Sequence, residues 1–324
     1  MKNKIGFTST VPVEVIIAAG YTPVDLNNIF INSNDPSAFV LEAERKGFPR
    51  NLCAWIKGIY TAAAVNGIDR IVCIGEGDCA SSVSMCEVAA GDGAKIIPFS
   101  YPGRRDPAGL KAEVERFAST LGTTLADAEK TRQHLSAVRK KLAILDEMTW
   151  KERKVSGGEN HYWLVSASDF NGDPRKFEGE LNDFLSKARS QQSSSFKPIA
   201  YVGVPPIVKD LYSYLNELGL EVVFNETQRQ FAFTRENPTI VEQYLEYTYP
   251  YGINYRLEKD ILPEIKKRGC IGVVHYVQSF CHRQIEDIIL RKNLRIPLLT
   301  LEMDKPGLLD NRSKIRLEAF SEML

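Results

Sequence analysis

Three of the six cysteines in this 324-residue chain stand at positions suited to metal chemistry. Cys79 and Cys281 each follow an apolar, strand-like run and precede a helical pattern, and Cys53 lies in the first turn of another predicted helix. Free backbone amides and the helix dipole at such positions favour the thiolate, which is the form of cysteine that binds a metal. The three positions therefore predict an iron-sulfur site shared between two parts of the chain.

The glycine-rich string GEGDCA, at residues 75–80, allows a second interpretation of the same region. It fits the G-x-G-x-x-A pattern of a dinucleotide-binding loop between a strand and a helix. Two features count against it: the preceding strand is about the third of its unit, and the strand at residues 96–102 ends without the acidic residue that would bind a ribose. Arg104 and Arg105 offer a contact to a 2′-phosphate instead, so nicotinamide binding stays open as an alternative.

Two side chains close to the cysteines are candidates for acid and base chemistry. Glu76 precedes Cys79 by three residues, at a strand end that should face a cleft, and a carboxylate there would act as a general base. His282 directly follows Cys281, where it would donate a proton to a substrate or a hydrogen bond to a cluster sulfur. Both are predicted site residues.

Three other titratable residues are interpreted as structural or solvated. Glu14 is expected to cap a helix or to lie in solvent. His134 falls within a charged helical pattern and His161 follows a GGEN loop, so both are expected on the surface.

Alternating strand-like and helical patterns in both halves of the chain predict the elements that position these residues. The predicted fold class is α/β, with two doubly wound parallel-sheet domains of the Rossmann or flavodoxin type. The N-terminal domain covers residues 1–194, with a helical excursion at about 107–151, and the C-terminal domain covers 195–324. Within the first domain, residues 22–31 are interpreted as a strand. Because such sheets place functional residues beyond the carboxyl ends of their strands, the predicted site lies in the cleft between the domains.

The composition narrows the range of partners and compartments. Lys plus Arg and Asp plus Glu both total 41, so no field of one sign would attract nucleic acid or an anionic membrane. No apolar run approaches the ~20 residues of a membrane span, and the N-terminal segment does not have the pattern of a signal peptide. We therefore expect a cytoplasmic protein without a nucleic-acid or membrane partner, whose cysteines are reduced rather than paired in disulfides.

Segments spread along the chain resemble one known family. They are, in order, VPVEVIIAAGYTPVDL (residues 11–26), NLCAWIKGIY (51–60), IGEGDCASSVSMCE (74–87), GVVHYVQSFC (272–281), IPLLTLEMD (296–304) and KIRLEAFSEML (314–324). In content and order they are similar to the iron-sulfur subunits of 2-hydroxyacyl-CoA dehydratases and benzoyl-CoA reductases. This is the D-component type of subunit, and the family includes the double-cubane cluster proteins.

The resemblance implies a cofactor, partners and a reaction. Cys53, Cys79 and Cys281 would bind one 4Fe-4S cluster and leave one iron open to another ligand. A separate ATP-hydrolysing iron-sulfur activator would deliver a low-potential electron for one-electron reduction of an acyl-CoA thioester, from which the dehydratases eliminate the 2-hydroxyl group. The chain would act in a homodimer, or in a heterodimer with a related subunit. Ala80 and Ser81 depart from the family, in which Asp-Gly often follows the second cysteine.

Two alternatives accompany this interpretation. Six cysteines also suit a double-cubane 8Fe cluster in a reductase of small molecules, with three thiolates on each cubane. We favour one cubane because Cys73 and Cys270 fall on predicted strands, away from the carboxyl edge, and only Cys86 offers an additional ligand. All three are interpreted as buried apolar residues. A cluster that bridges two chains of a dimer would change the number of cubanes expected per chain. The second alternative is a non-catalytic electron carrier or scaffold that keeps the fold and the cluster.

Overall fold

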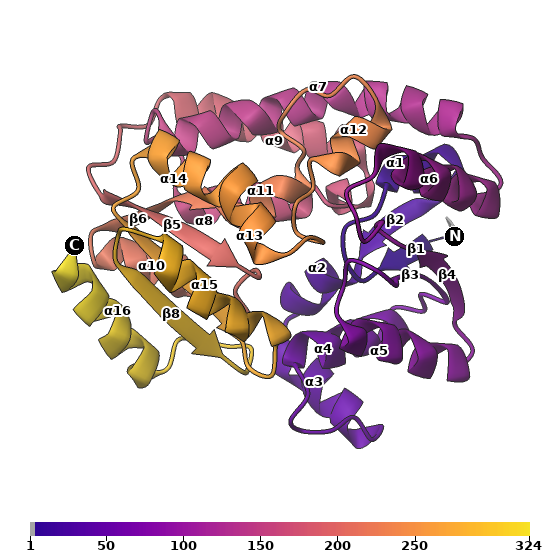
Figure 1. Cartoon of the computed structure of the whole chain (residues 1–324), viewed down its shortest axis with the longest axis horizontal. Helices are drawn as coiled ribbons and strands as arrows, with labels where there is room; N and C mark the ends of the chain where they lie inside the picture. The colour runs from indigo at the N-terminus through magenta and orange to yellow at the C-terminus, as the bar shows by residue number, and fades with distance from the viewer. Residues whose placement is uncertain (1–3) are drawn as a thin grey trace.

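The computed structural model describes residues 4–324, and within this range it contains two four-stranded sheets in which the paired strands are parallel (Figure 1). The first sheet has the order β2-β1-β3-β4 and the second has the order β6-β5-β7-β8. The strands are β1 (Lys4–Phe7), β2 (Thr22–Asp25), β3 (Arg70–Ile74), β4 (Lys95–Phe99), β5 (Lys197–Gly203), β6 (Leu220–Asn225), β7 (Gly272–Gln278) and β8 (Leu298–Met303). The predicted α/β fold with parallel sheets is confirmed.

The helices of the first half connect its strands as a parallel sheet requires. They are α1 (Val13–Ala18), α2 (Leu26–Ile31), α3 (Pro36–Arg45), α4 (Ala54–Val65) and α5 (Ala80–Gly91). The strand predicted at residues 22–31 is wrong in its second part, because β2 ends at Asp25 and α2 begins there. The Asp25 carboxylate accepts a hydrogen bond from the backbone amide of Asn27 at 2.9 Å. This side chain therefore caps α2 and marks the start of a helix where a strand was predicted.

A long helical segment follows the first sheet. It contains α6 (Pro107–Leu121), α7 (Leu125–Trp150), α8 (Gly157–Ser166), a short 3-10 turn η1 (Phe170–Gly172) and α9 (Pro174–Arg189). The predicted excursion at 107–151 is helical, but the helical segment extends to Arg189. In Figure 1, α7 runs along one side of the molecule past both halves. The division of the chain into domains at residues 194 and 195 stays a prediction.

The second half alternates strands with mostly short helices. They are α10 (Leu211–Glu217), α11 (Glu226–Phe231), α12 (Ile240–Leu245), α13 (Ile253–Arg256), the π-helical turn η2 (Leu257–Ile261), α14 (Leu262–Arg268), the 3-10 turn η3 (His282–Ile285), α15 (Glu286–Asn293) and α16 (Asn311–Met323). Every residue of β6 and β7 is buried. Such continuous burial is typical of parallel strands that are covered on both faces.

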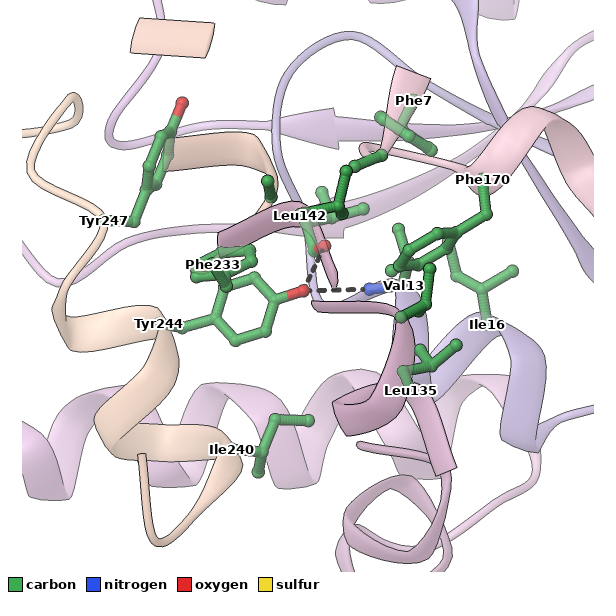
Figure 2. Packing of buried hydrophobic residues seen from close by; sticks show 14 of the residues in the cluster. Phe7, Val13, Ile16, Leu135, Leu142, Phe170, Phe233, Ile240, Tyr244 and Tyr247 are labelled. Atoms are coloured by element: carbon green, nitrogen blue, oxygen red, sulfur yellow. Dashed lines mark hydrogen bonds between the residues drawn. The ribbon is translucent and has the colours of Figure 1, made fainter. Parts of the chain in front are cut away.

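A buried apolar cluster joins the two halves (Figure 2). The Tyr244 hydroxyl from α12 accepts a hydrogen bond from the backbone amide of Val13 at 3.3 Å, and it lies 2.9 Å from the carbonyl oxygen of Val11. Leu135 and Leu142 of α7 pack in the same cluster. The α7 and α12 helices thus pack against the start of α1 and hold the halves together.

The prediction that Glu14 caps a helix or lies in solvent is wrong. Its side chain is fully buried beneath the same cluster, where it pairs with Arg139 of α7 at 2.6 Å. Gln243 donates a hydrogen bond to it at 2.8 Å, and the Tyr244 hydroxyl lies 2.7 Å from its second oxygen. Burial alone would raise the pKa of Glu14, but Arg139 and these hydrogen bonds hold that pKa below its ordinary value.

Candidate functional site

A cavity of about 510 Å³ lies between the two halves, at the carboxyl ends of their strands. Loops that follow four strands line it: residues 8–10 after β1, 78–82 after β3, 204–206 after β5 and 280–283 after β7. In each sheet these strands are the neighbours between which the strand order reverses. Open parallel sheets bind ligands at this switch point, so each half points its binding edge at the same cavity.

Cys53, Cys79 and Cys281 all line this cavity, so the structure brings together the three cysteines that the sequence singled out. Each one directly precedes a helical element: α4, α5 and the turn η3, respectively. Each thiol is partly buried. Their electrostatic fields also reach one another, since Cys79 and Cys281 both raise the pKa of Cys53.

Backbone amides at the three helix starts act to lower the pKa of the thiols, although none of the three side chains makes a capping hydrogen bond. The amides are those of Trp55 and Ile56 for Cys53, Ser81 and Ser82 for Cys79, and Arg283 for Cys281. Burial nevertheless outweighs these amides. It raises the pKa of Cys53 to about 12 and that of Cys79 to about 11, and it also raises the pKa of Cys281. The helix starts thus favour the thiolate, as expected, but alone they do not bring the thiol pKa below its ordinary value. A bound cation would favour the thiolates further.

The other three cysteines lie outside the set of described residues that line the cavity. Cys73 and Cys86 are buried in one apolar cluster, and Cys270 is buried just before β7. Among residues 4–324, no group of three or more His, Cys, Asp or Glu side chains is arranged to hold a single metal ion. A four-iron cluster spreads its thiolate ligands over separate irons. Three thiols around one cavity, each with amide donors, fit such a cluster better than a single ion.

The two predicted acid-base residues lie in different surroundings. His282 lines the cavity beside Cys281, and burial followed by the nearby charge of Arg283 lowers its pKa. Glu76 is exposed and lies outside the described lining residues. Asp78, two residues further along, does line the cavity, and burial raises its pKa.

The backbone turns at Gly77, between the exposed Glu76 and Asp78, which lines the cavity. The φ angle of Gly77, 101°, is one that residues with a side chain rarely adopt, and a Cβ at this position would lie 3.0 Å from atoms of Tyr101 and Pro250. The loop therefore turns at a position that only glycine fits. The glycines of GEGDC were visible in the sequence, but which acid would face the cavity was not.

His161 is a site residue that sequence reasoning missed. It comes from α8, lines the cavity and has a Gln228 amide nitrogen 3.3 Å from its Nδ1 atom. Burial lowers its pKa to about 4. The expectation that His161 is solvated is wrong, whereas His134 is exposed on α7 as predicted. The capping box formed by Ser156 and Glu159 predicts the start of α8 but not the surface that the helix covers.

Buried charges support the Cys281 side of the cavity. Arg283 donates hydrogen bonds to Glu286 and to the carbonyl oxygen of Tyr249, both at 2.9 Å, and its guanidinium lies 3.8 Å from the centroid of the Tyr249 ring. Arg256, which is fully buried, pairs with Glu286 and with Glu226 at 2.7 Å each. These contacts join the loop after β7 to α11, α13 and α15.

No helix in the described part of the chain combines the length and apolar character that crossing a membrane would require.

Two parallel α/β units that face one cavity with three cysteines define a two-lobed class of protein with its candidate site between the lobes. The model of one family, 2-hydroxyglutaryl-CoA dehydratase, D-component, matches residues 8–324. The chain belongs to this family, as its resemblance predicted, and it is a subunit of the 2-hydroxyacyl-CoA dehydratase type. A search of curated proteins found no match. The dinucleotide interpretation of residues 75–80 receives no support from the family match.

Proposed function

We propose that this chain is the iron-sulfur subunit of a 2-hydroxyacyl-CoA dehydratase-like enzyme. In this proposal an ATP-hydrolysing iron-sulfur activator supplies an electron for the one-electron reduction of an acyl-CoA thioester. The chain acts as a homodimer or beside a related subunit. The observation that carries the proposal is that Cys53, Cys79 and Cys281, from both halves of the chain, line one cavity.

The three thiolates are the proposed ligands of one 4Fe-4S cluster. Such a cluster supplies one-electron reducing power, whose potential depends on hydrogen bonds to sulfur and on exposure to solvent. The amides at the starts of α4, α5 and η3 are the proposed donors of those hydrogen bonds. With three cysteines in the lining, one position of a four-iron cluster has no cysteine ligand.

The rest of the lining combines apolar surface with polar side chains, as is usual for small-molecule sites. Ile31, Ile56, Val165 and Phe231 provide apolar surface that excludes water. Polar side chains complete the lining: Thr8, Ser9 and Asp78 follow strand ends, His282 begins η3 and His161 comes from α8. The volume, about 510 Å³, lies within the range of roughly 300 to 1,000 Å³ that is usual for small-molecule sites.

Eliminating a hydroxyl group requires a proton donor and a base. His282, which lines the cavity next to a proposed ligand, is the proposed donor. Glu76 was the base that the sequence suggested, but Asp78 is the carboxylate of the same loop that lines the cavity. We therefore propose Asp78 as the base and compare it with Glu76 below.

The positions of Cys73, Cys86 and Cys270 support one cubane over the double-cubane alternative. All three are buried, and each lies outside the cavity lining among residues 4–324. A second cubane in the same chain would need these thiols to reach the site, which would require a rearrangement of the packed core.

Iron and acid-labile sulfide per chain after anaerobic purification, with electron paramagnetic resonance of the reduced protein, test the proposal. We expect about four iron atoms. Cys53→Ala, Cys79→Ala and Cys281→Ala should each lose them, whereas the buried control Cys73→Ala should keep them. About eight iron atoms that depend on all six cysteines would contradict the single cubane and support the double-cubane reductase. A loaded protein that accepts electrons but never turns over a thioester would indicate an electron carrier.

A further inference from the structure

A chain of buried hydrogen bonds runs from the interior of the molecule to His161 at the cavity. It links side chains from five elements, in the order Asp146 (α7), Asn160 (α8), Asn225 (β6), Tyr212 (α10), Gln228 (α11) and His161 (α8). Several members can either donate or accept, so the direction of each bond must be worked out from groups that can do only one of these.

The inner end of the chain has a fixed direction. The Asp146 carboxylate is paired with Arg268 at 2.6 Å and can only accept. Asn160 therefore presents its Nδ2 amide group to Asp146, at 3.1 Å, and its Oδ1 atom faces the other way. Asn225 donates to that oxygen at 2.9 Å and to the backbone carbonyl of Gly157 at 3.2 Å. Both of these partners are acceptors, so the orientation of the Asn225 amide is determined as well.

The next two bonds, at Tyr212 and at Gln228, have a determined donor and acceptor as well. The Oδ1 atom of Asn225 must accept, and the Tyr212 hydroxyl donates its proton to it at 2.7 Å. Burial raises the pKa of Tyr212 far above its ordinary value, so that proton stays on the hydroxyl. With its proton used, the Tyr212 oxygen accepts from Nε2 of Gln228 at 3.3 Å.

The Gln228 amide in turn determines which nitrogen of His161 carries a proton. The same Nε2 group lies 3.3 Å from Nδ1 of His161, so Nδ1 accepts and carries no proton. Turning the Gln228 amide over would require Tyr212 to donate twice, which one hydroxyl cannot do. Neutral His161 therefore carries its proton on Nε2. The low pKa of this histidine agrees with a neutral ring near pH 7.

We propose that His161 is a catalytic residue whose Nε2–H donates a hydrogen bond to the thioester carbonyl oxygen of a substrate in the cavity. His161 lines the cavity with the three cysteines, and its Nδ1 side is occupied by Gln228. A positioned neutral donor stabilises negative charge that develops on a carbonyl oxygen, and it does so without giving up its proton. Gln228, Tyr212 and Asn225 are positioning residues in this scheme. The choice of a thioester rests on the proposed function, whereas the assigned tautomer does not.

Selective ¹⁵N labelling of histidine tests the tautomer without any substrate. The chain has four histidines, and the His161 signals are assigned as those lost in His161→Leu. In the oxidised, cluster-loaded protein near pH 7, we expect a protonated Nε2 and an unprotonated Nδ1. The isosteric change Gln228→Glu places a carboxylate against Nδ1 and should move a proton to it. A wild-type His161 that is protonated on Nδ1 overturns the proposal.

Infrared spectroscopy of bound 2-hydroxyglutaryl-CoA, labelled with ¹³C at the thioester carbonyl, tests the contact itself. Wild-type protein should lower the carbonyl frequency, His161→Leu should remove that shift, and His161→Gln, which keeps an N–H donor, should restore part of it. Loss of one such donor should lower kcat by about 10² to 10³ with a small change in KM.

The outcomes separate the two proposals. An equal carbonyl frequency in wild type and His161→Leu, with the cluster and turnover intact, overturns the role of His161 alone. A protein without a cluster or thioester turnover overturns the proposed function and the thioester as the partner of His161. The tautomer measurement still decides the direction of the hydrogen-bond chain in that case.

Discussion

The loop after β3 and the loop after β7 occupy equivalent places in the two sheets, yet different interactions hold them. The loop after β7 is anchored by ion pairs, in which Arg283 and Arg256 share the carboxylate of Glu286. The loop after β3 is held mainly by its backbone: the Tyr101 amide donates to the Glu76 carbonyl oxygen at 2.9 Å, and Gly77 packs against Tyr101. The two sheets have the same topology, but buried ion pairs hold the loop of Cys281, whereas close backbone packing holds the loop of Cys79.

The two halves also differ in how they bury pairs of carboxyl groups. In the second half, Glu226 and Glu286 lie on either side of Arg256. In the first half, the Asp169 carboxylate accepts from the backbone amide of Asp25 at 2.8 Å, and Asp25 accepts from the Ser168 hydroxyl at 2.6 Å. Arg256 places a positive charge between the two glutamates, whereas burial, and then the charge of Asp25, raise the pKa of Asp169. The comparison predicts different responses to mutation and to pH.

The largest expected effect is the loss of stability on removing the buried cation, Arg256. Arg256→Met should lower the free energy of unfolding by about 3 to 5 kcal/mol, because it leaves Glu226 buried without an ion-pair partner and Glu286 with Arg283 alone. Urea unfolding measures this change. Lys259→Met, which removes an exposed ion pair with Glu258, is the matched control and should change stability by less than about 0.5 kcal/mol. A loss below about 1 kcal/mol in Arg256→Met would show that the second half does not depend on this cation.

The next effect concerns the two acids of the loop after β3. Asp78→Asn should lower activator-dependent turnover of 2-hydroxyglutaryl-CoA about 100-fold, as is typical for loss of a positioned base. Glu76→Gln should stay close to wild type, because its side chain is exposed outside the cavity lining. Iron content should be unchanged in both variants. The reverse order of effects would restore Glu76 as the base and would place Asp78 among the structural residues.

A third expectation follows from the acid pair of the first half. Burial, and then the charge of Asp25, raise the pKa of Asp169 to about 7. A carboxyl with a raised pKa in the folded state stabilises the protein at low pH, and that contribution is lost as the pH rises through the folded value. Between about pH 4 and pH 7, wild type should therefore lose on the order of 2 kcal/mol more stability than Asp169→Asn.

Unfolding free energies of both proteins across that pH range measure the difference. Parallel curves for wild type and Asp169→Asn would mean that the pKa of Asp169 is not raised in the folded protein.

The smallest effect concerns Phe280, next to Cys281. Its φ angle of 64° is unfavourable for a residue with a side chain, and its ring is 59% exposed. Phe280→Gly should raise the free energy of unfolding by about 1 kcal/mol, since glycine adopts this angle without strain. Ile285→Ala, at an exposed apolar residue of the same segment, should change stability by less than about 0.5 kcal/mol. A loss of stability in Phe280→Gly would show that the ring packs at the rim of the cavity.

Much of the fold could be predicted because its signals are local. The apolar runs that became β3 and β7 are buried strands, and the amphipathic pattern after Pro107 became α6 and α7. The prediction failed where one side chain outweighed such a pattern. Residues 26–31 were predicted to continue a strand, but they form a helix that the Asp25 side chain caps.

The residues of the candidate site also differ in whether a local pattern predicts them. Cys53, Cys79 and Cys281 could be found from the sequence because each position follows from a local pattern, the start of a helix. Glu14 and His161 could not, because their surroundings come from Arg139 and Gln228, which lie far along the chain.

The amino-acid sequence by itself determined the alternation of strands and helices, the family and the positions of the three cysteines at helix starts. Only the tertiary structure decided that these cysteines share one cavity and that Asp78, rather than Glu76, lines it with His161. The physical reason is that hydrophobic periodicity and capping act over a few residues. Burial, hydrogen-bond direction and charge pairing instead depend on groups that meet only when the two halves pack together.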